Sequence, residues 1–589
     1  MEKLLSYTHM FFIVIIGIAF ALQARAELYD DSYTLDCLAT PPKAQYKGGM
    51  VINPEFNEGL NGWKMFEDAK VYHVTSNDGN KFIAASNRNP SYRSFTQTFD
   101  LETDKLYTFS AWLQVSHGKA DIAAVFMMET GPEIAGWVTA RKGCWSMLKG
   151  GLVVKAWGPA DLHFATNNTD VDILADSISL HSFTQEEWKS HQQQKIHKVR
   201  RKRVRLQAVD QTGRPMANAT VSLTQTRPGF PIGCTINQNI LHNPAYQSWF
   251  LSRFKFTVFE NELKWYSTEY MQGVEDYTTA DAMMQFAESH NVIVRGHNVL
   301  WDNPSCQPQW ARGLSGDNLF AAANKRTHSV VSRYKGRLIH WDVVNENMHY
   351  NFFETQLGKP SASTYFYQTA NQIDPNALLF LNEFNTIECS GDPASSPSKY
   401  VEKINLLKAQ GYNSKLAIGV QGHFPNNINL VYLRTALETL AQTGLPIWVT
   451  ELDVSAGPNQ AAGLDQVLHE LYSNPAVQGI MIWAAPGANG CYAMCLTDNY
   501  NFNNLDTGNV VDNFMGKLKQ GEHDDFDSPK TTDSNGFFET SLPHGEYEVK
   551  MSHPRLQEFY DFRKINIAPN KKKFTNSRVY RFTIIDPEN

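Results

Sequence analysis

The stretch "HWDVVNENMH" (residues 340–349) carries a hydrophobic, β-branched run directly into Asn345 and Glu346. About a hundred residues later, "PIWVTELDV" (446–454) repeats the pattern and delivers Glu451. Near-continuous apolar runs of this length are typical of strands in a parallel sheet that is covered on both faces. Both segments therefore predict buried strands that present a glutamate at their carboxyl ends.

Similar segments recur along the chain from Phe230 to about Met515. Eight of them can be read: "FPIGCTI", "FKFTVFE", "NVIVRGH", "LIHWDVVNE", "ALLFLNE", "LAIGVQGHF", "PIWVTELD" and "GIMIWAA". Helix-like stretches such as "YTTADAMMQFAESH" lie between most of them. This alternation predicts an α/β fold, a (β/α)₈ TIM barrel, at residues 230–520. An open doubly wound sheet is the alternative, but no glycine-rich phosphate fingerprint supports it.

Most of the predicted strands end in polar side chains. In a barrel of this type, the carboxyl ends of the strands build the active site. A single polar residue at a strand end usually only caps the strand. Polar residues at the ends of most strands, all on one rim, predict an active site. The residues concerned are Glu260, His297, Asn345 with Glu346, Glu383, Gln421 with His423, and Glu451 with Asp453, while the last segment ends at Trp483.

Two carboxyl groups that face each other across a cleft can hydrolyse a glycosidic bond. One protonates the leaving oxygen, and the other, ionised, attacks the anomeric carbon. Glu346 and Glu451 lie on well-separated strands and can flank a substrate. Metal catalysis by histidines and carboxylates of the same rim is the competing mechanism, but no HExxH helix or zinc-type Cys/His spacing appears. We found no GxSxG elbow or P-loop either, so we expect hydrolysis without a metal or other cofactor.

Several motifs occur in an order and spacing that identify a family. "ENELKW" (260–265), "RGHNVLW" (295–301), "WDVVNE" (341–346), "QGHF" (421–424) and "TELD" (450–453) together resemble glycoside hydrolase family 10. The resemblance covers about 230–520 and implies a retaining endo-β-1,4-xylanase on a (β/α)₈ barrel. "GCYAMCLTD" (490–498) is similar to a pattern of the secreted plant members.

The resemblance also implies roles for individual residues. Glu346 would be the general acid/base and Glu451 the nucleophile. Asn345 would form a hydrogen bond with the 2-hydroxyl of the sugar at the cleavage point. His423 and Asp453 would orient Glu451. The residues implied to hold the sugars on the glycone side are Glu260, Asn261, Lys264, His297, Trp301 and Gln421, with Trp483 as a stacking floor. His423 is also an implied substrate-binding residue.

Three features depart from the pattern of many bacterial members. Asp302 replaces a histidine, Phe384 in "NEFN" replaces a tyrosine, and "PGANGCYAMC" lacks a second tryptophan. None of these changes involves the two catalytic carboxyl groups. They concern subsite preference and rate.

The chain before the barrel has a different pattern. Residues 46–183 contain short alternating segments separated by turn signals, which predict an all-β jelly-roll sandwich. "INPEFNEGLNGWKMF" and "ILADSISL" resemble the carbohydrate-binding module family 22, and Trp63 is a candidate sugar-stacking residue, with a core position as the alternative. Residues 184–203 are polar and basic and predict a linker or connecting helix. Polyanion binding by the run 200–203 is the alternative.

Two further segments carry strand patterns. Residues 204–229 and 525–589 each contain alternating apolar positions, and an isolated hairpin is marginal in water. The two segments resemble parts of a transthyretin-like sandwich. We therefore predict one small β-sandwich built from both, with the barrel inserted between them. The alternative is that 203–224 packs on the outside of the barrel and the tail is a separate appendage.

The N-terminus predicts a signal peptide over residues 1–26. Lys3 precedes an apolar run that is too short for a bilayer span of ~20 residues, and a small-x-small pattern ends at Ala26. An uncleaved anchor is the alternative. We expect a secreted, extracellular protein of the cell wall, without membrane association after signal removal and monomeric. The net charge of −7 argues against nucleic-acid binding.

Secretion permits disulfides and glycosylation. Among the seven cysteines, Cys491 with Cys495 and Cys37 with Cys144 are candidate pairs. Asn167 and Asn218 lie in glycosylation sequons.

These observations predict a secreted retaining endo-1,4-β-xylanase that hydrolyses internal bonds of cell-wall xylan, its expected partner. Another retaining β-glycanase on the same barrel is one alternative. A non-catalytic protein that binds wall polysaccharide is the other, and the presence of both Glu346 and Glu451 argues against it.

Overall fold

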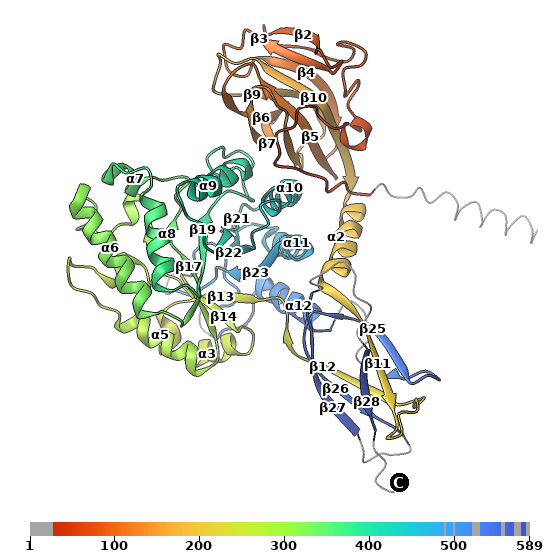
Figure 1. Cartoon of the computed structure of the whole chain (residues 1–589), viewed down its shortest axis with the longest axis vertical. Helices are drawn as coiled ribbons and strands as arrows, with labels where there is room; N and C mark the ends of the chain where they lie inside the picture. Colours follow the sequence, from red (N-terminus) through yellow and green to blue (C-terminus); the bar gives the residue numbers. More distant parts are fainter. Residues whose placement is uncertain are drawn as a thin grey trace, which may run out of the picture.

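Three folded parts make up the computed structural model of the chain: a β-sandwich module, a barrel and a smaller β-sandwich (Figure 1). The structure describes residues 28–487, 490–498, 501–520, 530–554, 560–569 and 579–584. The predicted signal peptide lies outside the described residues. None of the described helices combines the length and the apolar character that crossing a membrane requires.

The central part is a closed barrel of eight parallel strands, which confirms the predicted fold. Strand β20 pairs with both β19 and β22 and so closes the ring. The strands are apolar along their length because helices cover their outer face. Their bounds are β13 Ile232–Ile236, β14 Phe256–Phe259, β15 Ile293–Gly296, β17 Leu338–Asp342, β19 Leu378–Glu383, β20 Leu416–Val420, β22 Ile447–Val454 and β23 Val477–Ile482, with short extensions β16 Leu300–Trp301, β18 Val344–Asn345 and β21 His423–Phe424.

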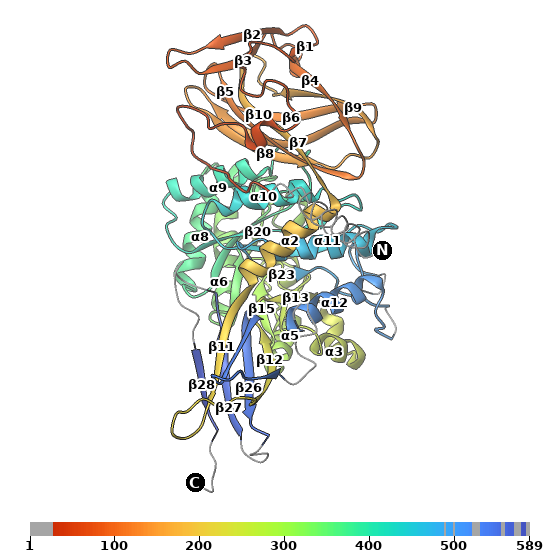
Figure 2. The ribbon, with the colours of Figure 1, turned by 90° about the vertical axis from the view of Figure 1, so that its right-hand side faces the viewer.

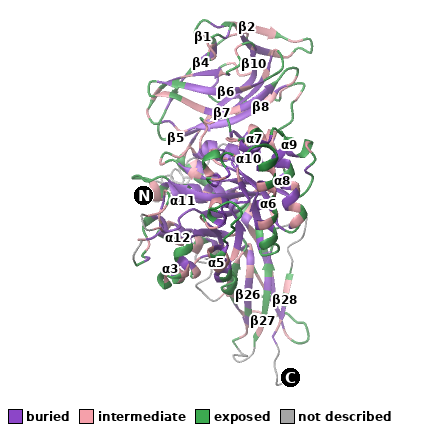
Figure 3. Ribbon diagram, turned by 90° about the vertical axis from the view of Figure 1, so that its left-hand side faces the viewer, coloured by how far each residue is buried: buried purple, intermediate pink, exposed green. Residues whose placement is uncertain are grey.

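Helices surround the barrel and are buried on their inward side, while their outer faces are exposed (Figure 3). One or more helices follow each strand, as the alternation in the sequence predicts. They are α3 Pro244–Leu251, α4 Trp265–Thr268, α5 Thr278–Ser289, α6 Gly316–Arg333, α7 Phe352–Leu357, α8 Ala362–Ile373, α9 Pro397–Ala409, α10 Leu430–Ala441, α11 Gln460–Ser473 and α12 Asp506–Gln520. Short 3₁₀ turns occur at η1 Gln45–Gly48, η2 Gln238–Leu241 and η3 Pro304–Cys306.

The N-terminal module is a sandwich of two five-stranded antiparallel sheets with the orders β1-β4-β9-β6-β7 and β2-β3-β10-β5-β8. Its core is lined by the apolar residues that alternate along each strand. The strands are β1 Lys64–Phe66, β2 Lys70–Thr75, β3 Lys81–Ser86, β4 Ser94–Leu101, β5 Lys105–Val115, β6 Lys119–Met128, β7 Gly131–Arg141, β8 Ser146–Leu152, β9 Gly158–Ala165 and β10 Ile173–Thr184.

Trp63 belongs to this core, so its assignment as a sugar-stacking residue is wrong. Its side chain is only 5% exposed, because it packs between Phe56 and Phe95. The indole Nε1 donates a hydrogen bond to the carbonyl of Ile52 at 3.1 Å, which satisfies the polar edge of the ring. A ring enclosed in this way has no free face for a sugar.

The segment 184–203, predicted as a linker or connecting helix, is largely the helix α2, Gln185–Arg200, which runs from the module along the barrel toward the small sandwich (Figure 2). Thr184 and Glu187 form a capping box at its start. Its buried side chains pack beside α11. Arg200, part of the basic run, is buried and donates to three backbone carbonyls at Tyr472, Asn474 and Val477. That guanidinium is therefore structural and is not available to a polyanion.

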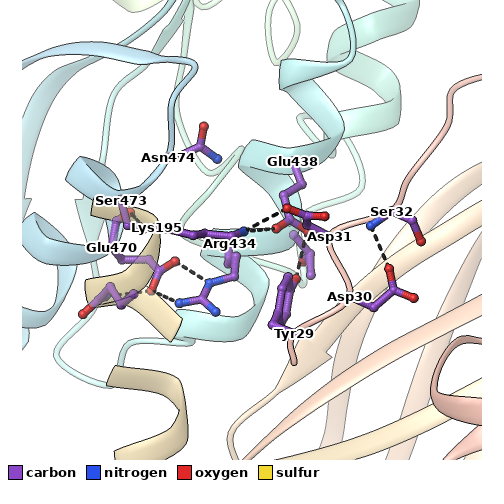
Figure 4. Close-up of polar contacts among 12 residues, drawn as sticks. Tyr29, Asp30, Asp31, Ser32, Lys195, Arg434, Glu438, Glu470, Ser473 and Asn474 are labelled. Atoms are coloured by element: carbon purple, nitrogen blue, oxygen red, sulfur yellow. Dashed lines mark hydrogen bonds and ion pairs between the residues drawn. The ribbon is translucent and has the colours of Figure 1, made fainter. Parts of the chain in front are cut away.

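One buried carboxylate joins three parts of the chain where the module meets the barrel. Glu438 of α10 accepts hydrogen bonds from Tyr29 of the N-terminal segment at 2.9 Å and from Lys149 of the module at 2.9 Å. Lys195 of α2 lies 3.1 Å from its other oxygen (Figure 4). Burial strengthens the contact with Lys149 most, because that ammonium is buried together with Glu438, whereas Lys195 is partly exposed.

A second buried ion pair lies beside it. Arg434 of α10 donates to both oxygens of Glu470 of α11, at 2.6 and 2.8 Å (Figure 4). Trp188 and Gln192 of α2 also donate to Glu470, and the guanidinium lies 3.5 Å from the centre of the Trp188 ring. Helix α2 is thereby fixed to the barrel by polar contacts that its sequence does not reveal.

The C-terminal sandwich consists of the sheets β25-β11-β28 and β24-β12-β26-β27. Strand β11 pairs with β25 and β28, and β12 pairs with β24 and β26. Residues before and after the barrel therefore share both sheets and one core, so the barrel is inserted between the two halves. The strands are β11 Arg201–Val209, β12 Thr220–Pro228, β24 Lys530–Thr531, β25 Phe537–Pro543, β26 Gly545–Ser552, β27 Tyr560–Ile567 and β28 Val579–Thr583.

Candidate active site

A cavity of about 600 Å³ opens at the carboxyl ends of the barrel strands. Parallel strands bring these ends to one rim, although the residues that line the cavity are spread over more than 200 positions. Every barrel residue assigned to catalysis or substrate binding lines it, except Asp453, which lies behind His423. The lining includes Glu260, Asn261, Lys264, His297, Trp301, Asn345, Glu346, Gln421, His423, Glu451 and Trp483.

Glu346 follows the short strand β18 and has a left-handed backbone with φ of 59°. Such a conformation costs a non-glycine residue on the order of 1 kcal/mol or more and is common at functional sites. The amide of Glu346 donates to the carbonyl of Asn382 at 2.9 Å, and its own carbonyl accepts from the amide of Tyr350 at 3.1 Å. These bonds hold the turn that projects the carboxyl group into the cavity.

The carboxyl group of Glu346 is 7% exposed and accepts two hydrogen bonds. Trp301 Nε1 lies 2.7 Å from one oxygen, and Gln421 Nε2 lies 3.0 Å from the other. Burial raises the pKa of Glu346 to about 7, although these two bonds oppose the rise. Glu346 therefore holds its proton in mildly acidic solution.

Glu451, within β22, has the opposite charge state. Burial alone would raise its pKa, but the nearby His297 and the contact with His423 lower that pKa to about 2. Asn382 Nδ2 donates to one oxygen at 2.9 Å, and His423 Nε2 lies 3.5 Å from the other. Asp453 lies 2.9 Å from the opposite nitrogen of His423. Glu451 is consequently a fixed, ionised carboxylate.

His423 owes its charge to these two carboxylates. Burial lowers its pKa, but Asp453 and then Glu451 outweigh that effect and raise it to about 11. The backbone amides of Gly422 and His423 donate to the buried Glu388, which fixes this short segment. The imidazolium therefore neutralises and orients Glu451.

A lysine and two indole rings form one wall of the cavity. Lys264 is buried, with its ammonium 4.6 Å from the ring centre of Trp301 and 5.8 Å from that of Trp483. It donates to Asn261 Oδ1 at 3.2 Å. Burial lowers the pKa of Lys264. A cation and aromatic faces side by side match a sugar, which offers hydroxyl groups and apolar C–H faces together.

Asn345 presents an unused donor. Its Oδ1 accepts from Asn382 Nδ2 at 2.9 Å, whereas its Nδ2 is buried and has no partner among the described residues. A buried amide without a partner is costly, so this N–H group is suited to a hydroxyl of a bound ligand. His297 Nδ1 lies 2.8 Å from the buried Asp342, which orients its ring.

Several residues of the site are not among those predicted from the sequence. Asn382 is buried behind the cavity and donates to both Asn345 and Glu451. It ends a predicted strand just before Glu383, so the strand-end rule applies to it as well. Tyr492 lies in the short loop closed by the disulfide between Cys491 and Cys495. Phe384, noted in the sequence only as a departure from the family pattern, also lines the cavity. The others lie in loops or short helical turns after strands and carry no comparable signal: Tyr266, Asn303, Cys306, Tyr350 and Asn385.

The remaining candidate residues lie away from the cavity. A disulfide joins Cys37 to Cys144, with an S–S distance of 2.00 Å. Asn167 and Asn218 are exposed on the module and on the small sandwich. In the described ranges, no cluster of three or more His, Cys, Asp or Glu side chains has a geometry that could hold a metal.

A (β/α)₈ barrel whose rim carries one protonated and one ionised carboxyl group, with polar and aromatic walls, defines an acid–base hydrolase of the glycosidase class. The comparisons agree with this class. Residues 222–491 match the family described as glycosyl hydrolase family 10, and residues 48–155 match a carbohydrate binding domain.

Curated relatives span nearly the whole chain. The Arabidopsis thaliana protein Endo-1,4-beta-xylanase 5 is 40% identical over 90% of this chain and 90% of its own length. Endo-1,4-beta-xylanase 5-like, from the same plant, is 40% identical over 89% of this chain and 90% of its own length. Among solved structures, xylanase 10B from Thermotoga petrophila RKU-1 in complex with xylobiose is 26% identical and covers 49% of this chain and 95% of that one, with a TM-score of 0.44. The chain belongs to glycosyl hydrolase family 10.

Proposed function

We propose that this protein is a secreted, retaining endo-1,4-β-xylanase that hydrolyses internal β-1,4-xylosidic bonds of cell-wall xylan. The observation that carries the proposal is the pair Glu346 and Glu451, which line one cavity in opposite protonation states. The curated relatives that span the chain bear the name endo-1,4-beta-xylanase, which supports xylan as the substrate.

The reaction follows from the two charge states. Glu346 gives its proton to the glycosidic oxygen as the bond to the anomeric carbon breaks, and Glu451 attacks that carbon to form a glycosyl ester. Glu346, now a carboxylate, then removes a proton from water, and the resulting hydroxide equivalent displaces Glu451. Two inversions give net retention, which is also what the family resemblance implies.

The walls of the cavity supply binding and orientation. The free Nδ2 of Asn345 can donate to the sugar hydroxyl next to the anomeric carbon. Lys264, Trp301 and Trp483 enclose the glycone side with one cation and two aromatic faces. The carbohydrate binding domain supports a polymeric substrate, because such a domain holds a chain near the enzyme. Secretion is a part of the proposal that the N-terminal pattern and the two disulfides support. A location in the cell wall follows from the proposed xylan substrate, and a monomeric state is proposed with it.

Product analysis tests this proposal directly. Purified protein should release reducing sugar from xylan, and far less from cellulose or mixed-linkage glucan. Short xylo-oligosaccharides should appear while the viscosity of xylan falls early, since internal bonds are cut. Proton NMR during hydrolysis should show the β-anomer first. A preference for glucan, or an α-anomer formed first, would contradict the substrate or the stereochemistry respectively.

A further inference from the structure

His349 lies three residues after Glu346 and contacts two carboxylates at once. Its Nδ1 is 2.7 Å from Glu383 Oε1, and its Nε2 is 2.8 Å from Asp392 Oδ2. A neutral imidazole donates from only one nitrogen, whereas an imidazolium donates from both. Two ionised acceptors on opposite sides of the ring therefore select the charged form.

Glu383, at the end of β19, is fully buried and needs these donors. Its carboxylate also accepts from the backbone amides of Met348 at 2.9 Å and Phe384 at 3.1 Å. His349 supplies the positive charge that lies within contact of it. The turn that carries Glu346 and the loop that follows β19 thus meet at one buried carboxylate.

The same ring supports the wall of the cavity. The rings of His349 and Phe384 are stacked, with centroids 3.8 Å apart and planes at 11°. Asp392, held by His349, accepts from Asn385 Nδ2 at 2.7 Å. Phe384 and Asn385 both line the cavity, whereas His349 lies behind them.

The position of this wall follows from the strand order of the barrel. The strands that carry Glu346 and Glu451 divide the ring into two arcs: β15, β14, β13 and β23, which bring the glycone-side Lys264, Trp301 and Trp483, and β19 with β20. Gln421 and His423, which follow β20, contact the two carboxyl groups themselves. Phe384 and Asn385 therefore face the part of a substrate beyond the cleaved bond. That part is the aglycone, the leaving portion of the chain.

We propose that His349, as an imidazolium, is a positioning residue that fixes Phe384 and Asn385 as the aglycone wall and ties this wall to the turn of Glu346. The inference rests on the proposed glycosidase function and adds to it a determinant of substrate choice. Because of His349, substrates with sugars beyond the cleaved bond have a higher kcat/KM than substrates without them.

The charges around His349 agree with this role. Burial lowers its pKa, but Glu383 and Asp392 together raise it to about 9, so the ring stays charged at neutral pH. The groups that face it are Glu383 from β19, Asp392 from the following loop and the neighbouring Tyr350. Lys403 of α9 donates to the carbonyl of Asn347, two residues before His349, at 2.9 Å.

Two neutral variants separate the contacts of the ring. His349→Asn places an amide donor near the Nδ1 position and can keep the bond to Glu383. His349→Gln places one near the Nε2 position and can keep the bond to Asp392. Both remove the charge and the stacked ring. His328→Gln, at an exposed position of α6, is the matched control.

The test compares two substrates with the full-length protein. Xylohexaose places sugars on both sides of the cleaved bond. Dinitrophenyl β-xylobioside has no aglycone sugar, and its dinitrophenolate group leaves without being protonated. Both His349 variants should lower kcat/KM for xylohexaose about tenfold, mainly through KM, because a misplaced wall disturbs the bound chain. The aryl substrate should change less than about twofold. Equal losses on both substrates, or no loss on either, would overturn the proposal.

A second measurement does not depend on activity. In wild-type protein with ¹³Cε1-labelled histidine, the signal that disappears in His349→Asn should stay at the imidazolium position from about pH 6 to about pH 8. A midpoint near about pH 6.5 would overturn the charged role. If the wild type hydrolyses neither substrate, the proposed function fails, and this titration still decides the role of His349. Should both variants fail to fold, Asp392→Asn must shift the substrate preference in the same direction.

Discussion

The pH dependence of the reaction should move when one hydrogen bond to Glu346 is removed. Trp301 Nε1 donates to its carboxyl oxygen at 2.7 Å and stabilises the ionised form. The variant Trp301→Phe keeps an aromatic face beneath Lys264 but deletes this donor. Burial then acts with less opposition, so the pKa of Glu346 should rise.

The size of the change can be worked out from the site. A hydrogen bond to a charged group contributes about 1.5–3 kcal/mol, and the protonated acid retains part of it, so we expect a net loss near 1.4 kcal/mol or about one pKa unit. With a pKa of about 7 in the wild type, roughly one tenth of Glu346 is protonated at about pH 8. In the variant roughly half should be. Activity at about pH 8, relative to about pH 6, should therefore be about fivefold greater in the variant.

The assay is kcat/KM for xylan against pH, because this ratio reports ionisations of the free enzyme. The absolute rate will fall with the loss of a substrate contact, but the alkaline midpoint is independent of that fall. Trp483→Phe is the control, since Trp483 lines the same cavity and no bond to Glu346 is found for it among the described residues. An alkaline midpoint that stays in place or moves to lower pH in Trp301→Phe would refute the assignment of Glu346 as the general acid.

Four further predictions use the same structure. Glu451→Ala should abolish xylan hydrolysis, and azide should partly restore turnover by forming a glycosyl azide of inverted configuration; recovery with retained configuration would contradict its role as nucleophile. Glu346→Ala should lower kcat/KM for xylan by about 10²–10⁴ but spare a substrate with an activated leaving group; equal losses on both would argue against acid catalysis. Lys149→Met should lower the urea midpoint by the equivalent of about 3 kcal/mol because it leaves a buried carboxylate short of a partner, whereas the more exposed Lys195→Met should cost about 1 kcal/mol or less; equal shifts would contradict this ranking. Trp137→Phe loses a hydrogen bond to the loop after β19 and should raise KM for xylohexaose by up to about fivefold; an unchanged KM would show that the module does not support this loop.

The barrel and its two carboxyl groups could be predicted because short stretches of sequence determine where the strands lie and which residues stand at their ends. A continuous apolar run indicates a buried parallel strand, and the residue at its end must lie on the rim. Glu346 and Glu451 are found by this rule alone. Asn382 obeys the same rule, but it precedes Glu383, and the strand-end rule selects the charged Glu383 at this position instead.

Other features depend on contacts that the sequence does not encode locally. Helix α2 has few apolar residues, so its sequence allows either a linker or a connecting helix, and only the fold brings Trp188 onto Arg434. Trp63 follows a turn-rich segment, and the sequence pattern there is the same for a tryptophan in the core and a tryptophan on the surface. His349 gains its two carboxylate partners from positions 34 and 43 residues away, which only the barrel brings beside it.

The loop after β19 connects the module to the chemistry. Trp137 of β7 donates to the carbonyl of Ser390 in this loop at 2.9 Å, and Lys119 and Arg141 of the module lie 3.3 and 3.2 Å from Glu402 of α9. Two residues beyond Ser390, the same loop supplies the carboxylate that His349 holds. Because a loop between two anchors has less freedom than one with a single anchor, the module contributes to the rigidity of the cavity wall as well as to any binding of its own. We therefore expect that removing the module would alter the cavity wall at Phe384 and Asn385, even for a substrate too short to reach both the module and the barrel.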